Sequence, residues 1–305
     1  MPNELNRWRS TLLLLGFLSV SIPAAAADLG SAPAVVELPH EADRWAVQFT
    51  PYAWLTFLNG DSTIKGRTTE FDLNPRQVLS HLESLPWMSY TEARKGPLAL
   101  YNDVFFANLG ISGSGVRARD FGPISTTTSI SASLNFKEAV VEVGGAYQIA
   151  HWATGSPTAT GFTPSVAFDV LAGVRYWYQD LAVGVDVTKV VSIGALTISG
   201  GRAIARGGSV DWVDPVVGLR YRNQIAPGQE ILLRGDIGGF DVGSKFSWNL
   251  LGAYNFDFLV RDGVKYSGML GYRLLDVNYT QGEGTNKYGY DVLQHGPVLG
   301  LTVNF

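Results

Sequence analysis

The amino-acid sequence predicts an all-β fold: a transmembrane antiparallel up-and-down β-barrel of about 12 strands, within a range of about 10 to 14, with one short loop helix. Three observations support this fold class. Apolar and polar residues alternate along most of the chain, and the last strand ends on an aromatic residue, Phe305. Aromatic residues make up 12% and charged residues only 16% of the sequence, and 35 of the 305 residues are glycine. Such a barrel needs an apolar and aromatic outer face without any long apolar run.

The chain begins with a predicted secretory signal peptide, residues 1–27. Two arginines precede an apolar run over residues 11–22, and the alanines that follow suit cleavage before Asp28. Residues 28–44 contain two prolines and charges of both signs, which is typical of a flexible leader. We therefore expect export through the inner membrane, a periplasmic leader, and a barrel over residues 45–305 in the outer membrane of a Gram-negative cell.

The composition excludes several classes of protein. The chain has no cysteine, so it has neither disulfides nor thiolate metal ligands. After Asp28 no stretch approaches the roughly 18 consecutive apolar residues of a membrane-spanning helix. Removal of the signal peptide, which carries two arginines and one glutamate, changes the formal net charge from −4 to about −5, and this gives no reason to expect a nucleic-acid partner. We predict no cofactor and no metal site.

Alternation with a period of two defines the predicted strands. The most regular segments, each close to the roughly 10 residues that a tilted strand needs to cross the hydrocarbon, are 45–58, 137–152, 165–179, 181–191, 209–222, 229–240 and 245–258. The other predicted strands are 85–95, 98–111, 124–136, 264–279 and 291–305. Strict alternation over 98–111 would turn either Asn102 or Asp103 towards lipid, which predicts a bulge or a short strand there.

The lengths of the predicted connections give the barrel an orientation. With the N-terminus in the periplasm, the connections on that side are mostly short: KGP at 95–97, NFK at 135–137, QD at 179–180, NQIAPGQ at 223–229 and FLVRDG at 258–263. The connections on the outer side are longer: 59–84, 112–123, 153–164 and 192–208. Short periplasmic turns and long outer loops are the asymmetry of outer-membrane barrels.

The first long loop contains the only good helix signal, which predicts a helix from Asn74 to Glu83. Asn74 can cap this helix, and Pro75 suits the first helical position. The residues that form its apolar side are Val78, Leu79, Leu82 and Leu85. A short amphipathic helix in such a loop would lie against the rim of the barrel or fold into the lumen as a plug.

Several sequence segments resemble an uncharacterised family of proteobacterial outer-membrane β-barrel proteins. These segments are TPYAWL (50–55), EARKG (92–96), WVDPVVGLR (212–220), RGDIGGFDVGS (234–244), GYRLLDVNY (271–279) and HGPVLGL (295–301). The resemblance covers nearly the whole predicted mature chain and implies a location and a fold, but no activity for any residue. The alternating end at Phe305 also resembles the terminal strand of bacterial outer-membrane barrels generally, which is taken to be a recognition signal for the barrel assembly machinery.

Charged residues of both signs occupy the predicted inward faces of the strands. On the lipid face an arginine near the bilayer midplane would cost about 2 to 4 kcal/mol, so we expect these side chains to point into the lumen. The candidate lumen-lining residues are Glu92, Arg94, Glu142, Asp169, Arg175, Asp186, Asp214, Arg220, Arg222, Arg234, Asp236 and Arg273. The charges could pair across strands and fill the interior, or they could line a narrow hydrated pore for a small polar solute.

One hairpin suggests a close pair of carboxylates. Counting outward from the turn at 223–228 places Asp214 near Asp236, with Arg220 and Arg234 one step further in. Two close carboxylates need a cation or a proton, and a structural arginine clamp is the expected solution. The tripeptide RGD at 234–236 lies within the same strand and its charged residues are expected to point inward, which argues against display to an adhesion receptor.

The predicted function is therefore a narrow porin-like channel for small polar solutes or a structural barrel with a charge-paired interior, and not an enzyme. A rim-located hydrolase acting on lipid or peptide is an alternative, because His151 and His295 fall near the predicted outer ends of strands; the spacing does not place Ser112, Ser114 or Ser156 beside either histidine. A surface-binding or adhesive barrel is a further alternative. The expected partners are outer-membrane lipid, lipopolysaccharide and the barrel assembly machinery.

Overall fold

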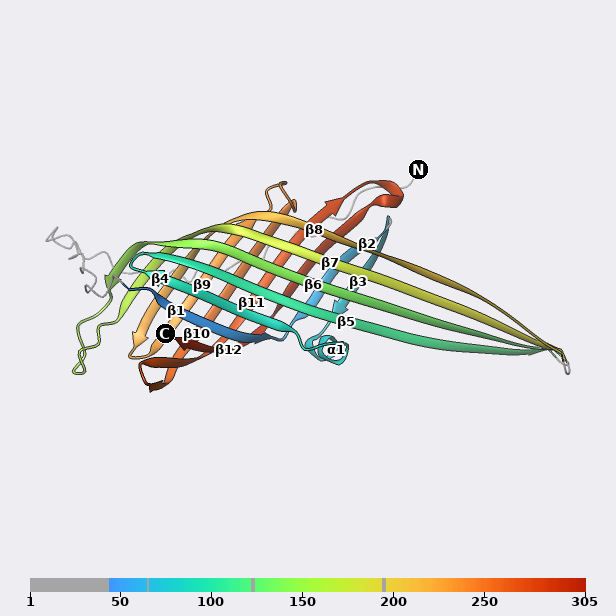
Figure 1. The fold of residues 1–305 in the computed structure, drawn as a ribbon, viewed down its shortest axis with the longest axis horizontal. Helices are drawn as coiled ribbons and strands as arrows, with labels where there is room; N and C mark the ends of the chain where they lie inside the picture. The colour runs from blue at the N-terminus through green and yellow to red at the C-terminus, as the bar shows by residue number, and fades with distance from the viewer. Residues whose placement is uncertain (1–43, 65, 122–123, 194–195) are drawn as a thin grey trace, which may run out of the picture. The chain divides into compact units, whose positions relative to one another are not determined.

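The computed structural model describes residues 44–305, except residue 65, residues 122–123 and residues 194–195. The predicted signal peptide and all but the last residue of the predicted leader therefore lie outside the described residues. Most of the described chain forms antiparallel β-strands (Figure 1). Among the described residues, no helix has the length and the apolar composition needed to cross a lipid bilayer.

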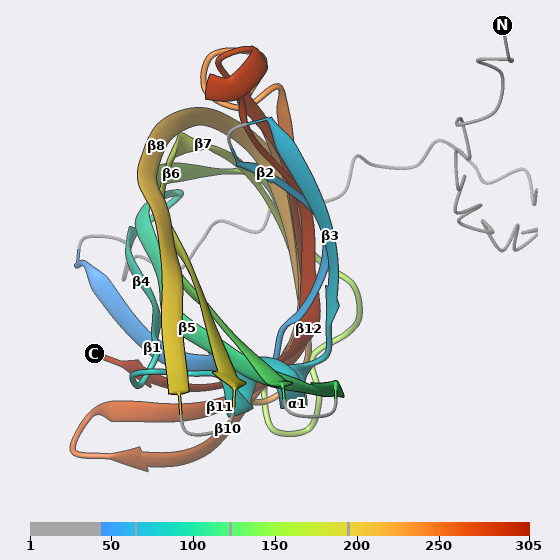
Figure 2. The same ribbon diagram turned by 90° about the vertical axis from the view of Figure 1, so that its right-hand side faces the viewer.

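The strands close into a barrel. Its members, in the order in which they pair, are β1 (Ala46–Trp54), β4 (Trp87–Lys95), β5 (Leu98–Phe121), β6 (Ile124–Ala153), β7 (Ser165–Ile193), β8 (Leu196–Ala226), β9 (Gln229–Gly238), β10 (Phe246–Arg261), β11 (Val264–Gln281) and β12 (Tyr288–Asn304). Pairing of β12 with β1 completes the ring, which Figure 2 shows end on. The sheet has 12 strands, and β2 and β3 lie outside the ring, so ten strands close the barrel.

Both ends of the barrel chain meet at one rim, which we call the terminal rim. The backbone N–H of Phe305 donates to the carbonyl oxygen of Val47 at 2.8 Å, and Val47 donates back to Phe305 at 3.3 Å. The tight turns at 96–97, 227–228 and 262–263 lie at the same rim. A closed seam leaves no unpaired strand edge at this level, which is the condition for a sheet to sit in lipid.

The outward faces near the terminal rim are apolar and the inward faces are polar. On β7, Val170 and Val174 are exposed, whereas Asp169 and Arg175 are buried in the lumen. Other exposed apolar residues include Leu98, Leu100, Val143, Tyr147, Ile149, Val213, Val217, Leu219, Ile231, Leu233, Ile237, Leu250, Leu270, Leu299 and Leu301. The predicted alternation of outward-facing and lumen-facing residues is confirmed for these strands.

Asn102 and Asp103 lie in a regular part of β5 that contains no bulge. Asn102 is exposed on the outer face, and Asp103 is buried in the lumen. The pairing of β5 with β6 is regular across this point, where Asn102 opposes Val143 and Asp103 opposes Glu142. The predicted irregularity is wrong because one uncharged amide on the apolar outer face costs less than breaking the ladder of hydrogen bonds.

Four strands are much longer than the sequence predicts. Strands β5 to β8 contain 24, 30, 29 and 31 residues. In the part of the chain that the structure describes, β6 is the only strand that pairs with β5 beyond Phe106, apart from a short bridge of residues 81–83 to residues 108–110, and β7 is the only strand that pairs with β8 before Val216. The four strands therefore continue past the closed ring as a separate extension of the sheet (Figure 1).

The extension explains the errors in the predicted connections. The predicted turns at 135–137 and 179–180 are wrong, because these residues lie inside β6 and β7. Neither segment contains glycine or proline, so nothing in them ends a strand. Most of 112–123 and 192–208 is strand rather than loop, and the loop between β6 and β7 lies at the terminal rim, opposite to the side predicted.

The predicted loop 59–84 contains a hairpin and a short helix. Strands β2 (Phe57–Ile64) and β3 (Arg67–Leu73) pair with each other, and β2 extends the sheet beside β12 beyond the end of β1. Helix α1 (Pro75–Ser80) has the predicted cap: the side chain of Asn74 accepts the N–H of Gln77, and the Gln77 side chain accepts the N–H of Asn74.

Helix α1 is shorter than predicted and lies next to β5, just beyond the start of β4 at the rim opposite the terminal rim. After His81 the chain leaves the helix and forms a backbone bridge to β5, between Leu82 and Leu109. Val78 borders a cavity of about 20 Å³ that also contacts Phe105 and Glu138. The segment thus lies against the wall beside β5, and Leu85, expected on its apolar side, is 90% exposed.

Candidate functional site in the barrel lumen

The lumen contains a chamber of about 490 Å³ that begins at the terminal rim. Rim residues such as Gly228, Asn304 and Phe162 line its mouth, and Arg234 and Arg273 lie at its inner end. The side chains between them are largely polar and include Gln48, Thr50, Tyr52, Tyr90, Gln224, Asn249, Asn255 and Thr302. Because inward positions alternate with lipid-facing ones, a polar chamber and an apolar exterior come from the same strands.

Three arginines converge on one carboxylate at the wall of the chamber. Asp169, which is fully buried, accepts Arg220 Nε at 2.8 Å, Arg222 Nε at 3.0 Å and Arg94 Nη2 at 3.3 Å. Glu92 accepts Arg94 Nε at 3.1 Å and also accepts Arg220. We call these five residues the arginine wall. Charge-assisted hydrogen bonds of this kind fix the side chains in one geometry.

A second set of ion pairs lies deeper, across the centre of the lumen. Arg175 Nη2 donates to Glu142 Oε2 and to Asp236 Oδ1, both at 2.6 Å. Arg234 pairs with Glu142 as well, and its guanidinium carbon lies 4.8 Å from the ring centre of Tyr101. Burial of charges is costly unless each has a partner, and here each carboxylate has at least one arginine.

Arg273 connects these ion pairs to the aromatic side chains that lie further from the terminal rim. Its Nη1 lies 2.8 Å from Asp103 Oδ2, and it also donates to the hydroxyl of Tyr52 at 3.0 Å. Its guanidinium carbon lies 5.0 Å from the ring centre of Trp54. A cation over an aromatic face is favourable, so Arg273 stabilises the boundary between the charged and the aromatic side chains.

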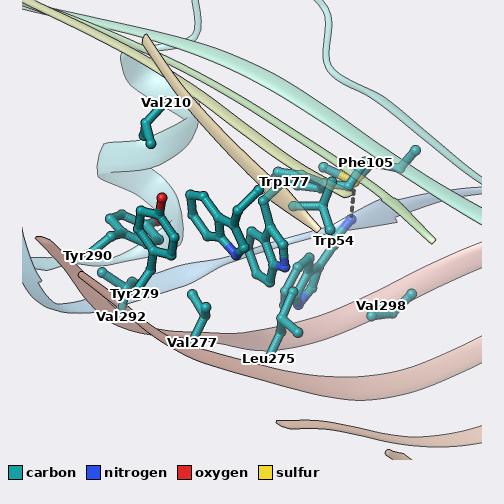
Figure 3. Close-up of a cluster of buried hydrophobic side chains, with 13 residues drawn as sticks. Trp54, Phe105, Trp177, Val210, Leu275, Val277, Tyr279, Tyr290, Val292 and Val298 are labelled. Carbon is teal, nitrogen blue, oxygen red and sulfur yellow. Dashed lines mark hydrogen bonds between the residues drawn. The ribbon is translucent and has the colours of Figure 1, made fainter. Parts of the chain in front are cut away.

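An aromatic cluster closes the lumen beyond the ion pairs (Figure 3). Trp177 and Trp212 stack with ring centres 5.5 Å apart, and Trp212 stacks on Tyr279 at 3.9 Å. Leu275 and Val277 pack beside them and are almost fully buried. Buried apolar side chains packed this densely leave no room for a file of water molecules.

A polar layer follows the aromatic cluster. The Glu138 carboxylate accepts hydrogen bonds from the amides of Gln179 and Gln294 at 2.8 to 3.0 Å and from the hydroxyl of Tyr290 at 3.2 Å. Tyr288 donates to Gln179 Oε1 at 2.7 Å and holds that amide in place. Among the described residues, Glu138 has no arginine or lysine within ion-pair distance, in contrast to Glu142, Glu92 and Asp169.

The structure brings most of the predicted lumen-lining charges together. Glu92, Arg94, Asp169, Arg220 and Arg222 belong to the arginine wall, and Glu142, Arg175, Arg234, Asp236 and Arg273 to the deeper ion pairs. The charged residues of the RGD tripeptide are therefore buried in the lumen, as the sequence predicts.

Two of the predicted residues do not join them. Asp214 is buried but accepts the N–H and the hydroxyl of Ser244 at 2.6 and 2.8 Å. The predicted pairing of Asp214 with Asp236 is wrong, because β8 continues to Ala226 and turns only at 227–228, so that Gly218 lies opposite Asp236. The prediction for Asp186 assumed a turn at 179–180, but β7 continues through these residues without a turn. The side chain of Asp186 lies outside the described part of the structure.

The two histidines expected near one rim are far apart along the barrel. His151 lies near the end of β6 at the terminal rim, where it pairs with Ala167 of β7. His295 lies on the outer face of β12, where its ring nitrogens contact Tyr272 Oη at 2.7 Å and Asn59 Oδ1 at 3.0 Å. In the described chain, no serine is recorded as a hydrogen-bond partner of either ring, and no cluster of His, Asp and Glu suits a metal ion.

Sequence reasoning missed the residues that close the lumen. Trp54 and Trp177 stand at inward positions of predicted strands, yet only charged residues were selected as lumen-lining candidates. Large aromatic residues at inward positions were the available signal, since a hydrated pore would not place indole rings there. Glu138 was missed as well, although it lies in the predicted strand 137–152 on the same inward face as Glu142.

Comparison with known proteins adds little to this geometry. No protein-family model and no curated protein matches the chain. Among solved structures, a FadL homologue from Pseudomonas aeruginosa shares 8% identity over 86% of this chain and 90% of that chain, with a TM-score of 0.27. OpdK from Pseudomonas aeruginosa shares 9% identity over 86% and 99%, with a TM-score of 0.21. The P. putida toluene transporter TodX shares 9% identity over 86% and 89%, with a TM-score of 0.20. Similarities this low carry no argument about function.

Proposed function

We propose that the chain is an outer-membrane barrel that acts as a narrow, gated channel for small polar solutes. The observation that carries the proposal is the sequence of layers in the lumen: a polar chamber at the terminal rim, then ion pairs, then the aromatic cluster. A chamber without a path beyond it admits a solute but does not pass it. Movement of the aromatic cluster is therefore the step that opens the channel.

The apolar exterior supports the location in a membrane. Large apolar side chains such as Leu100, Val217 and Leu301 are about half exposed around the ring, and a soluble protein rarely exposes so many in one band. The predicted signal peptide and the seam at Phe305 support insertion into the outer membrane, with lipid and lipopolysaccharide around the barrel and the barrel assembly machinery as the partner during folding.

Planar-bilayer recording of the refolded full chain tests the gate. We expect rare, brief conductance steps for the unmodified protein and frequent, longer steps for Trp177→Ala, because removal of this indole breaks the stack with Trp212. The matched control is Trp152→Ala, since Trp152 is 40% exposed on the outside of the barrel, where it stacks on Phe168.

The outcomes separate the candidate functions. A large steady conductance in the unmodified protein, unchanged in Trp177→Ala, would mean that the aromatic cluster is not the gate. Absence of conductance in every well-folded variant would instead favour a structural barrel with a charge-paired interior.

A further inference from the structure

We infer that the arginine wall is a binding site for a small oxyanion, a carboxylate or a phosphate. The inference rests on the proposed function in one respect, since it names the class of solute that the chamber accepts. It is carried by a surplus of positive charge at one wall of the chamber, which the deeper ion pairs do not share.

The arginine wall has more cations than anions. Arg94, Arg220 and Arg222 share the two carboxylates of Asp169 and Glu92. The deeper ion pairs are balanced, with Arg175, Arg234 and Arg273 against Glu142, Asp236 and Asp103. The surplus positive charge of the ion-paired interior is therefore located beside the chamber rather than in the sealed part of the lumen.

The arrangement of the wall presents this charge to the chamber. Asp169 has no exposed surface and lies behind the arginines, whereas the side chains of Arg94 and Arg222 are 20% and 19% exposed. All three arginines line the chamber. An entering solute consequently meets three guanidinium groups and one carboxylate of the wall, Glu92, because Asp169 does not line the chamber.

The donors of the wall are not all used. Arg94 Nη1 is buried and has no hydrogen-bond partner among the described residues. Arg222 is held from two sides, by Asp169 and by Gln148 Oε1 at 2.9 Å, so its guanidinium is fixed in place before a solute arrives. Fixed planar guanidinium groups suit carboxylate and phosphate oxygens, because they offer paired N–H donors.

One acid on a neighbouring strand limits the strength of the site. Glu230 lines the chamber, opposes Gln224 in the pairing of β8 with β9, and accepts Asn255 Nδ2 at 3.2 Å. Among the described residues it has no arginine or lysine at ion-pair distance. Its negative charge opposes an anion in the chamber, so its removal should strengthen binding.

Calorimetric titration of the refolded full chain in detergent, at constant ionic strength, tests the site with acetate, succinate, inorganic phosphate and the dication putrescine. We expect at least one oxyanion to bind and putrescine not to bind. Arg222→Gln should weaken oxyanion binding about tenfold, as expected for the loss of a charge-assisted contact. Arg261→Gln, in an exposed ion pair with Asp262 outside the chamber, should leave the affinity within about twofold.

A second variant keeps the test independent of the folding of Arg222→Gln. Glu230→Gln should tighten oxyanion binding by at least about twofold, since it removes a negative charge from the chamber. Affinity unchanged in both variants, or stronger binding of putrescine than of every oxyanion, would overturn the inference. Oxyanion binding without conductance in any variant would contradict the channel and leave the site standing, whereas conductance without oxyanion binding would contradict the site alone.

Discussion

The two halves of the lumen are built on the same strands but filled in opposite ways. On β7, Arg175 forms ion pairs, and Trp177, the next inward residue, belongs to the aromatic cluster. On β11, Arg273 and the next inward residue, Leu275, repeat the change. One step of two residues thus separates a charged layer from an apolar one. The difference indicates that buried ion pairs fill the lumen next to the chamber, whereas apolar and aromatic side chains fill it further from the terminal rim.

The two layers should respond differently to the loss of one side chain, and the largest effect is expected in the charged layer. Arg175→Ala leaves Glu142 and Asp236 buried with too few cations, which should reduce the free energy of unfolding by about 3 to 5 kcal/mol. Urea unfolding in detergent or lipid vesicles measures the change.

The partners of Arg175 provide the control. The double variant Arg175→Met, Asp236→Asn removes one cation and one anion and leaves Glu142 paired with Arg234, so it should regain much of the loss. A single Arg175→Ala variant as stable as the unmodified protein would show that the ion pairs are hydrated and that the charged layer is not sealed.

The aromatic layer should fail by a different mechanism. Leu275→Ala leaves a cavity beside Val277 and the indole rings, with an expected loss of about 2 to 5 kcal/mol. Leu275→Met nearly conserves the volume and should cost less than about 1.5 kcal/mol. The same unfolding assay applies, and equal losses for the two variants would contradict dense packing in this layer.

Asn102 and Asp103 are adjacent in the chain but lie on opposite faces of the barrel wall, so substitutions at the two positions compare the outer face with the lumen. Asp103→Asn removes the charge that pairs with Arg273 and should lower stability by about 1.5 to 3 kcal/mol. Asn102→Leu replaces an exposed amide with an apolar side chain on the outer face and should raise stability in lipid vesicles, on the order of 1 kcal/mol. Opposite signs at consecutive residues are the expected result, and equal signs would contradict the assigned faces.

Much of this contrast was present in the sequence. Alternation is a local property, so the lumen-facing charges from Glu92 to Arg273 and the lipid-facing residues opposite them could be assigned strand by strand. The cap of α1 was equally local, since Asn74 and Gln77 are only three residues apart.

The remaining features depend on contacts between distant residues. The ends of β6 and β7 could not be predicted, because the alternation continues through Asn135 and Asp180 without a residue that breaks a strand. The partner of Asp214 depends on where β8 turns; the chain turns at 227–228, later than predicted, and this changes every pairing along β8 and β9. The stack of Trp177 on Trp212 joins neighbouring strands, and the contact of Trp212 with Tyr279 crosses the lumen, so neither follows from spacing along the chain.

The most direct test of the two-layer lumen is thiol labelling, because the chain contains no cysteine of its own. Thr302→Cys places a thiol in the wall of the chamber, and Val277→Cys places one in the aromatic cluster, where the native residue is 1% exposed. A charged, water-soluble thiol reagent applied to each refolded variant should label Thr302→Cys rapidly and leave Val277→Cys protected until the barrel is unfolded. Equal rates of labelling at the two positions in the folded protein would contradict a lumen that the aromatic cluster closes at the inner end of the chamber.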